Sequence, residues 1–351
     1  MSYRIIRSFD GIGSLEQEWQ ALLSDGAAPF SSYSWNVEWL RAFRTLCDEI
    51  LVFAFYDGDG AITAIFPLYR KEKQIRFIGD GCSHHQDIVV REAEAAEWGW
   101  RVVIGYVRSE GCSMIIPKVS SGSFIAEVVM LSLADAPMLV EHQSLGYSQC
   151  FRVASGMKGD APKPFEEPAG VELRVKEGRG IMDGEIEKVA DLHGRQFRER
   201  DDVSLFENDV FRRFVRKVAR RDDAGARLLT LGVGKELAAF ILGFSRGGTF
   251  YVYASGIDEG HRDWAPDRYL WRAMVRLFRE EPGVSLIDVS CSPDVMVSDL
   301  ADAEYELFAI TLRQRTAFNR LFSRSVGFLP PVLRKDALAA DYGRGYERAE
   351  K

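Results

Sequence analysis

Apolar and polar residues recur along this chain in two blocks that predict the same order of secondary-structure elements. Each block has a strand, two stretches with helical spacing, three short apolar runs, a longer helix and a second strand. The apolar runs lie within residues 49–81 and 227–258, and turns rich in Gly, Asp, Lys and Arg separate them. The pattern therefore predicts an α/β fold with mixed, α+β-type sheets, used twice.

Further elements are expected on either side of these two segments. They are strands at 3–9, 113–119 and 285–290, and helices at 92–108, 185–200, 208–221 and 266–280. In the first block, Ser14 and Gln17 have the spacing of a capping box that would begin a short helix. Trp35, Trp39 and Phe43 recur at helical spacing and predict a second helix there.

The boundary between the blocks is expected in the polar stretch 157–170, which contains three prolines and has little apolar periodicity. We therefore predict an N-terminal domain over residues 1–160 and a C-terminal domain over 161–351.

Composition and charge narrow the classes of function. The chain has 351 residues, of which 46% are apolar, so it can bury large cores. Its net charge of −7 argues against a DNA partner. The five cysteines are scattered and form no C-x-x-C pair, which is typical of a reducing, cytoplasmic compartment and predicts no zinc site. We find neither a signal-peptide core nor an apolar run long enough to span a membrane.

Several short motifs in the second block carry a resemblance to a known family. They are Leu192-His193, the hairpin at 236–244 and 249–254, Gly256-Ile257-Asp258, Ala265-Pro266, and Asp288 at a strand end. In this order and spacing they resemble a tandem GNAT N-acyltransferase. The resemblance is closest to the CelD/BcsL-like group, which is named for bacterial cellulose biosynthesis, and more distant to the FemABX-like aminoacyl transferases.

The resemblance implies an acyl-CoA donor, bound where two parallel strands splay apart. The pantetheine arm would pair with the edge of the strand at 250–254, and the pyrophosphate would lie over the start of the helix at 266–280. The residues implied in donor binding are Tyr253, Ala254, Pro266, Asp267 and Arg268.

The same resemblance points to residues for the chemistry of transfer. A base must accept a proton from the acceptor, and an acid must protonate the thiolate that leaves. The candidates are His193, Asp258, Asp288 and Tyr305. Two of them also fit a purely structural role, His193 as a buried core histidine and Asp258 as the cap of a turn.

A polar segment in the first block is the candidate acceptor site. His84, His85 and Asp87 follow a Gly-rich turn, and together with Tyr251 they are expected to contact an amine or hydroxyl acceptor in a cleft between the two halves. Such an acceptor would be a small molecule, a lipid or a polysaccharide. Adjacent histidines on an extended chain point to opposite faces, so we expect no metal here. A plain turn is the alternative.

Two departures from the family pattern keep other functions open. Asp267 stands where the family has a small residue, and Tyr305 is followed by Glu306 instead of Lys. A carboxylate at that helix start repels a pyrophosphate. The alternatives are an aminoacyl-tRNA-dependent, FemABX-like transferase and a non-catalytic protein with a degenerate GNAT fold.

The segment 312–335 has six basic residues and no acidic one. Apolar and basic residues interleave in it, which is typical of an amphipathic helix on an anionic membrane surface or against phosphates. The other interpretation is a closing helix that packs on the domain with a solvated basic face.

Overall fold

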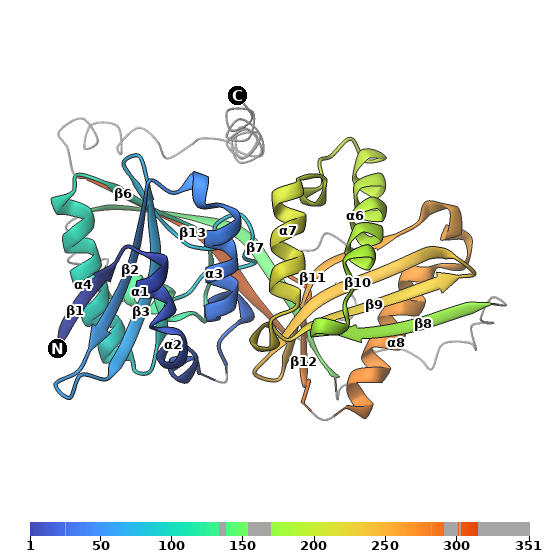
Figure 1. The fold of residues 1–351 in the computed structure, drawn as a ribbon, viewed down its shortest axis with the longest axis horizontal. Helices are drawn as coiled ribbons and strands as arrows, with labels where there is room; N and C mark the ends of the chain where they lie inside the picture. The colour runs from blue at the N-terminus through green and yellow to red at the C-terminus, as the bar shows by residue number, and fades with distance from the viewer. Residues whose placement is uncertain are drawn as a thin grey trace.

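The computed structural model describes residues 1–24, 26–132, 138–153, 170–281, 283–290, 301 and 303–314. These residues form one mixed sheet that runs through both halves of the molecule, with helices packed on its two faces (Figure 1).

The strands of the sheet have the following bounds. They are β1 (Ser2–Ile6), β2 (Glu49–Tyr56), β3 (Ile62–Lys71), β4 (Gln74–Phe77), β5 (Val89–Val90), β6 (Ser113–Ser120), β7 (Leu139–Arg152), β8 (Val171–Glu177), β9 (Ala226–Val233), β10 (Glu236–Arg246), β11 (Thr249–Ile257), β12 (Leu286–Asp288) and β13 (Ala303–Arg313).

The α-helices are α1 (Phe9–Gly13), α2 (Glu16–Leu22), α3 (Tyr33–Ala42), α4 (Ala93–Ser109), α5 (Phe124–Ser132), α6 (Asp183–Arg198), α7 (Asp209–Ala219) and α8 (Pro266–Glu280). Short 3-10 helices complete the chain, among them η6 (Asp222–Ala224) and η7 (Glu259–Trp264). This order confirms the predicted fold class and the double use of one element pattern.

The strand order is β1-β2-β3-β4-β6-β13-β7-β12-β11-β10-β9-β8, with β5 paired to β3. The strands of the first half lie at one end of the sheet and those of the second half at the other, as Figure 1 shows. Between them, β7 and β13 run antiparallel, with the whole of β13 paired to residues 139–150 of β7. Because β13 comes from the end of the described chain and also pairs with β6, the two halves share one sheet. The predicted division at residue 160 stays a prediction.

Strand β13 is not among the elements expected from the sequence. Phe308, Ile310 and Leu312 are buried in the core between the first-half strands and their helices, and this burial supports a strand even though Glu304 and Glu306 interrupt the apolar pattern. Residues 312 and 313 of the basic segment belong to this strand, and 315–335 lie outside the described residues.

Three apolar cores hold the layers together. One contains side chains of α2, α3, α6 and α7 and therefore belongs to both halves. A second lies between the first-half strands, α4 and α5. The third lies between β9–β12 and α8, on the sheet face opposite α6 and α7. The shared core fixes the second-half helices against α3.

The start of the chain differs from the expected capping box. Ser8, not Ser14, caps a helix, because its hydroxyl accepts a hydrogen bond from the Gly11 amide and so begins α1. Helix α2 begins after Leu15 without a side-chain cap. The predicted second helix is confirmed as α3, which Ser32 caps. Within the described ranges, we find no helix with the length and apolarity needed to cross a bilayer.

Candidate functional site

The central feature of the second half is a gap between two parallel strands. Strands β11 and β12 pair only over three positions, from Thr249 opposite Leu286 to Tyr251 opposite Asp288. Strand β11 then continues to Ile257, whereas the chain after β12 stays with β7, since the Val289 amide donates to the Gln149 carbonyl. The edge of β11 from Val252 onward therefore has no strand beside it among the described residues.

A β-bulge lies where the two strands part. In the β10–β11 pair, Leu242 is opposite Ala254 and Gly243 is opposite Val252, so Tyr253 is an extra residue. Gly243 is required here because a Cβ atom at this position would lie 2.3 Å from the Phe250 ring and 2.5 Å from the Tyr251 carbonyl. The bulge bends β11 away from β12 and opens the gap.

A cavity of about 570 Å³ passes through this gap. It is lined by Phe240 and Ala254 from the core shared with α6 and α7, and by Val252 and Trp271 from the core under α8. The cavity thus reaches both faces of the sheet. Its size and its route along a free strand edge suit a long, thin ligand that can hydrogen-bond to backbone.

The N-terminal end of α8 forms one end of this cavity. Pro266 is the first residue of the helix, and Ala265 before it is left-handed, with φ 51°. Asp267, Arg268 and Arg262 line the cavity, and Arg262 also pairs with Glu259 at 2.9 Å. Free amides and two guanidiniums attract an anion here, while the Asp267 carboxylate opposes it.

His193 lines the same cavity from α6. Its Nδ1 lies 2.7 Å from the Ser204 hydroxyl, and its ring stacks on Phe197 with 4.3 Å between centroids. Burial, with a smaller effect of Arg200, lowers the pKa of His193 to about 4, so the ring is neutral at pH 7. Because Ser204 holds Nδ1, Nε2 is the nitrogen left for proton transfer.

The two adjacent histidines of the first half line two different cavities, as expected because neighbouring side chains on an extended chain point to opposite faces. His84 lines the large cavity, where its ring stacks on Tyr253 at 5.0 Å between centroids. His85 lines a second cavity of about 240 Å³, together with Asp87 and Tyr251. Burial lowers the pKa of His84 to about 3 and that of His85 to about 4.

Asp288 and Tyr305 also line the small cavity and form a buried network. The Asp288 carboxylate accepts hydrogen bonds from the Tyr305 hydroxyl, from the Ser148 hydroxyl at 2.7 Å and from the Ser290 amide at 2.8 Å. Burial, then the Asp288 charge, raises the pKa of Tyr305 far above its usual range. The hydroxyl therefore stays protonated.

Asp258 lies outside both cavities. Its side chain caps η7 through the Gly260 amide at 2.9 Å and pairs with Arg195 at 2.9 Å. Of the residues proposed to bind the donor, Tyr253, Ala254, Asp267 and Arg268 line the large cavity, and Pro266 begins the helix beside it.

The sequence did not single out several residues that line the large cavity. They are Lys118, Gln196, Phe197, Arg200 and Phe240. For Gln196 and Phe197 a signal existed, since they follow His193 at i+3 and i+4 and share its face of α6, whereas Arg200 lies just after the helix ends. Lys118 is on β6 of the other half, and no pattern within its own strand connects it to this cavity.

Comparison with known proteins agrees with this geometry. Residues 163–318 match the family model described as an acetyltransferase (GNAT) domain. A search of curated proteins gave no match.

Three solved structures resemble nearly the whole chain. FemX has a TM-score of 0.58 and 12% identity, with 92% of this chain and 99% of that chain covered. A tandem GNAT protein from the clavulanic acid biosynthesis pathway has a TM-score of 0.53 and 15% identity, with coverages of 89% and 98%. The C-terminal domain of a putative lysylphosphatidylglycerol synthetase from Agrobacterium fabrum has a TM-score of 0.53 and 10% identity, with coverages of 88% and 95%. At these identities the likeness is one of fold, and the fold is a tandem GNAT-like one.

Proposed function

We propose that this chain is an acyltransferase that moves an acyl group from acyl-CoA to an amine or hydroxyl of a small-molecule, lipid or polysaccharide-related acceptor. The observation that carries the proposal is the cavity of about 570 Å³ that passes through the gap between β11 and β12. A degenerate, non-catalytic fold would be expected to fill this gap with side chains, whereas here it is hollow.

We expect the acyl-CoA donor to lie in this cavity in one orientation. The pantetheine arm would pair with the free edge of β11 after Val252, and the pyrophosphate would meet the amides at the start of α8 together with Arg268. Backbone amides near the bulge at Tyr253 would then face the thioester carbonyl and stabilise the oxyanion.

The acceptor is assigned to the small cavity lined by His85, Asp87 and Tyr251. On β11, Tyr251 lines the small cavity and its neighbour Val252 lines the large one. In the same way, Asp288 lines the small cavity and Val289 lines the large one. The two cavities therefore flank the same pair of strands. Asp288 and Tyr305 would orient the acceptor. Asp258 lies outside both cavities, and its role would be to hold the Arg195 side chain in place.

In the transfer step, the acceptor nitrogen or oxygen attacks the thioester carbon. The new C–N or C–O bond forms as the C–S bond breaks, and the acceptor proton passes to Nε2 of His193. The imidazolium then returns this proton to the thiolate of CoA. A neutral His193 at pH 7 is in the correct state to accept the proton.

The test is a calorimetric titration of the full chain with acetyl-CoA and longer acyl-CoAs. Arg268→Gln is expected to weaken binding by about tenfold to a hundredfold, the usual effect of one charge-assisted hydrogen bond. Arg276→Gln, on the same helix but 83% exposed, is the matched control and should bind like the native chain. If the native chain binds no acyl-CoA, the donor assignment is wrong.

Asp267 favours one alternative. Its carboxylate lines the proposed pyrophosphate end of the cavity, and the fold is also that of FemX. An aminoacyl-tRNA donor would bring no CoA pyrophosphate to this helix. Binding of aminoacyl-tRNA together with failure to bind any acyl-CoA would favour this function.

A further inference from the structure

A second large cleft lies away from the acyl-transfer site, between helices of the two halves. It has a volume of about 1220 Å³ and is bounded by α2 and α3 of the first half and by α7 and η6 of the second. It shares no lining residue with the two cavities described above. Six cationic and four acidic side chains line it, so it has excess positive charge in a chain whose net charge is −7.

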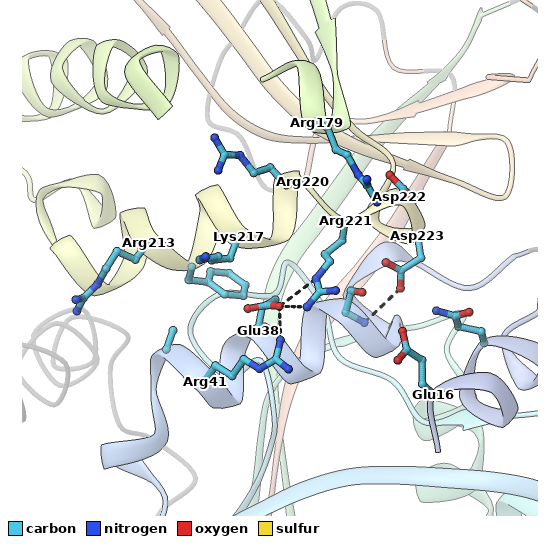
Figure 2. A pocket seen from close by; sticks show the side chains of 14 residues that line it. Glu16, Glu38, Arg41, Arg179, Arg213, Lys217, Arg220, Arg221, Asp222 and Asp223 are labelled. Atoms are coloured by element: carbon cyan, nitrogen blue, oxygen red, sulfur yellow. Dashed lines mark hydrogen bonds and ion pairs between the residues drawn. The ribbon is translucent and has the colours of Figure 1, made fainter. Parts of the chain in front are cut away.

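The floor of the cleft is a buried carboxylate held between two guanidiniums. Glu38 of α3 is 5% exposed, and its Oε1 accepts hydrogen bonds from Arg41 Nη1 at 2.7 Å and from Arg221 Nε at 3.0 Å (Figure 2). Nearby, the Ser34 amide donates to Asp223 at 3.3 Å. These contacts join the two halves and fix the cleft without any ligand.

Two cations of the cleft differ from their neighbours. Along α7 and the turn after it, Arg212, Arg216, Arg220 and Arg221 each form ion pairs with acidic side chains. Arg213 and Lys217 line the cleft and have neither an ion pair nor a hydrogen bond in the part of the chain that the structure describes. They are four residues apart on one helix face, where like charges destabilise each other. An anion in the cleft would relieve this repulsion.

The distribution of charge along the cleft limits the size of the anion that could bind there. Arg213 and Lys217 lie toward one end of the cleft, and Glu16, Asp222 and Asp223 lie toward the other, as Figure 2 shows. A nucleic-acid backbone along the whole cleft would meet these carboxylates, which would repel it. A compact anion at the basic end avoids them.

We propose that this cleft binds a small phosphate-bearing ligand, whose phosphate groups contact Arg213 and Lys217. Arg41 is on the facing helix, where it holds Glu38, and its side chain is 52% exposed. The inference does not depend on the acyl-transfer assignment.

The test is calorimetry of the full chain with inorganic pyrophosphate and with a nucleoside diphosphate as probes. The variant Arg213→Gln/Lys217→Gln is compared with Arg101→Gln/Arg276→Gln. The control makes the same change of charge at two sites that are 78% and 83% exposed. We expect the cleft variant to weaken binding at least tenfold, and the control to change it less than twofold.

The donor cavity must be distinguished from the cleft, because it too is proposed to bind a pyrophosphate. Arg268→Gln should leave the cleft-dependent binding unchanged, and the cleft variant should bind acyl-CoA like the native chain. Equal effects of the cleft and control variants would overturn the proposal, as would pyrophosphate binding that depends on Arg268 alone.

Vesicles containing phosphatidylglycerol and unacylated tRNA test the larger anions. If either binds through Arg213 and Lys217 while pyrophosphate and the nucleoside diphosphate do not bind, the small-ligand proposal is wrong. The surface would then recognise a membrane or an RNA.

Discussion

The hydroxyl of Tyr305 donates a hydrogen bond to the carboxylate of Asp288, and this bond connects two strands that are not neighbours in the sheet. Strand β7 lies between them, with Ser148 opposite Tyr305 and Cys150 opposite Asp288. The bond therefore spans the junction of the halves and forms one wall of the small cavity.

Tyr305→Phe removes this bond and leaves a buried carboxylate oxygen without its donor. We expect the free energy of unfolding to fall by about 1–3 kcal/mol. Tyr147→Phe, on β7 and 55% exposed, is the control and should change stability little. Chemical denaturation measures both. Because Tyr305 does not line the donor cavity, acyl-CoA affinity should be unchanged, and a parallel loss of affinity would contradict the separation of the two cavities.

Asp267→Asn removes the negative charge from the first turn of α8. If a pyrophosphate binds there, acyl-CoA should bind about fivefold more tightly, since a charge at a helix terminus contributes about 1 kcal/mol. Asp209→Asn makes the same change in the first turn of α7 and is the matched control. Calorimetry gives both affinities. Tighter binding in both variants would show an effect of overall charge only.

Glu38→Gln weakens the contact between the halves, because it leaves Arg41 and Arg221 without their shared charge. The carboxylate is buried but both arginine side chains are partly exposed, so the expected loss of stability is about 1–3 kcal/mol, below the cost of a fully buried pair. Glu280→Gln breaks an exposed pair with Arg276 and should cost under about 0.5 kcal/mol. Equal losses, measured by denaturant unfolding, would show that Glu38 does not fix the halves.

His85 makes stability depend on pH. Its folded pKa of about 4 is below the unfolded value of about 6.5, so its contribution is complete above pH 6.5 and is lost as the pH falls toward 4. The difference in unfolding free energy between the native chain and His85→Gln should therefore shrink over this range, by at most about 3 kcal/mol.

Asp87 has the opposite sign and must be separated from His85. Burial raises its pKa to about 7, so its contribution grows as the pH falls. The Asp87 carboxyl is present in both the native chain and His85→Gln, so its contribution cancels when the two free energies of unfolding are subtracted. Denaturation curves at several pH values test the prediction, and a difference that does not vary with pH would contradict it.

The sequence predicted those elements whose periodicity is complete within one segment. Helix α8 and the β10–β11 hairpin have clear apolar patterns and were placed nearly to the residue. The bulge at Tyr253 could not be predicted, because it depends on the register between β10 and β11.

Features that depend on distant residues were not visible. Strand β13 is stabilised by β6 and β7, and its glutamates hide the pattern. Glu38 and Arg221 are 183 positions apart, so nothing in either segment indicates the clamp between them. The split of His84 and His85 between two cavities followed from alternation along the chain, but the identity of the cavities did not.

The free edge of β11 is the central claim, and amide hydrogen exchange tests it most directly. On addition of acetyl-CoA, the backbone amides of residues 252–257 should exchange more slowly, because the pantetheine arm would pair with them. Strand β9, already paired on both sides, should not change. Unaltered exchange at 252–257 with saturating acetyl-CoA would contradict the account.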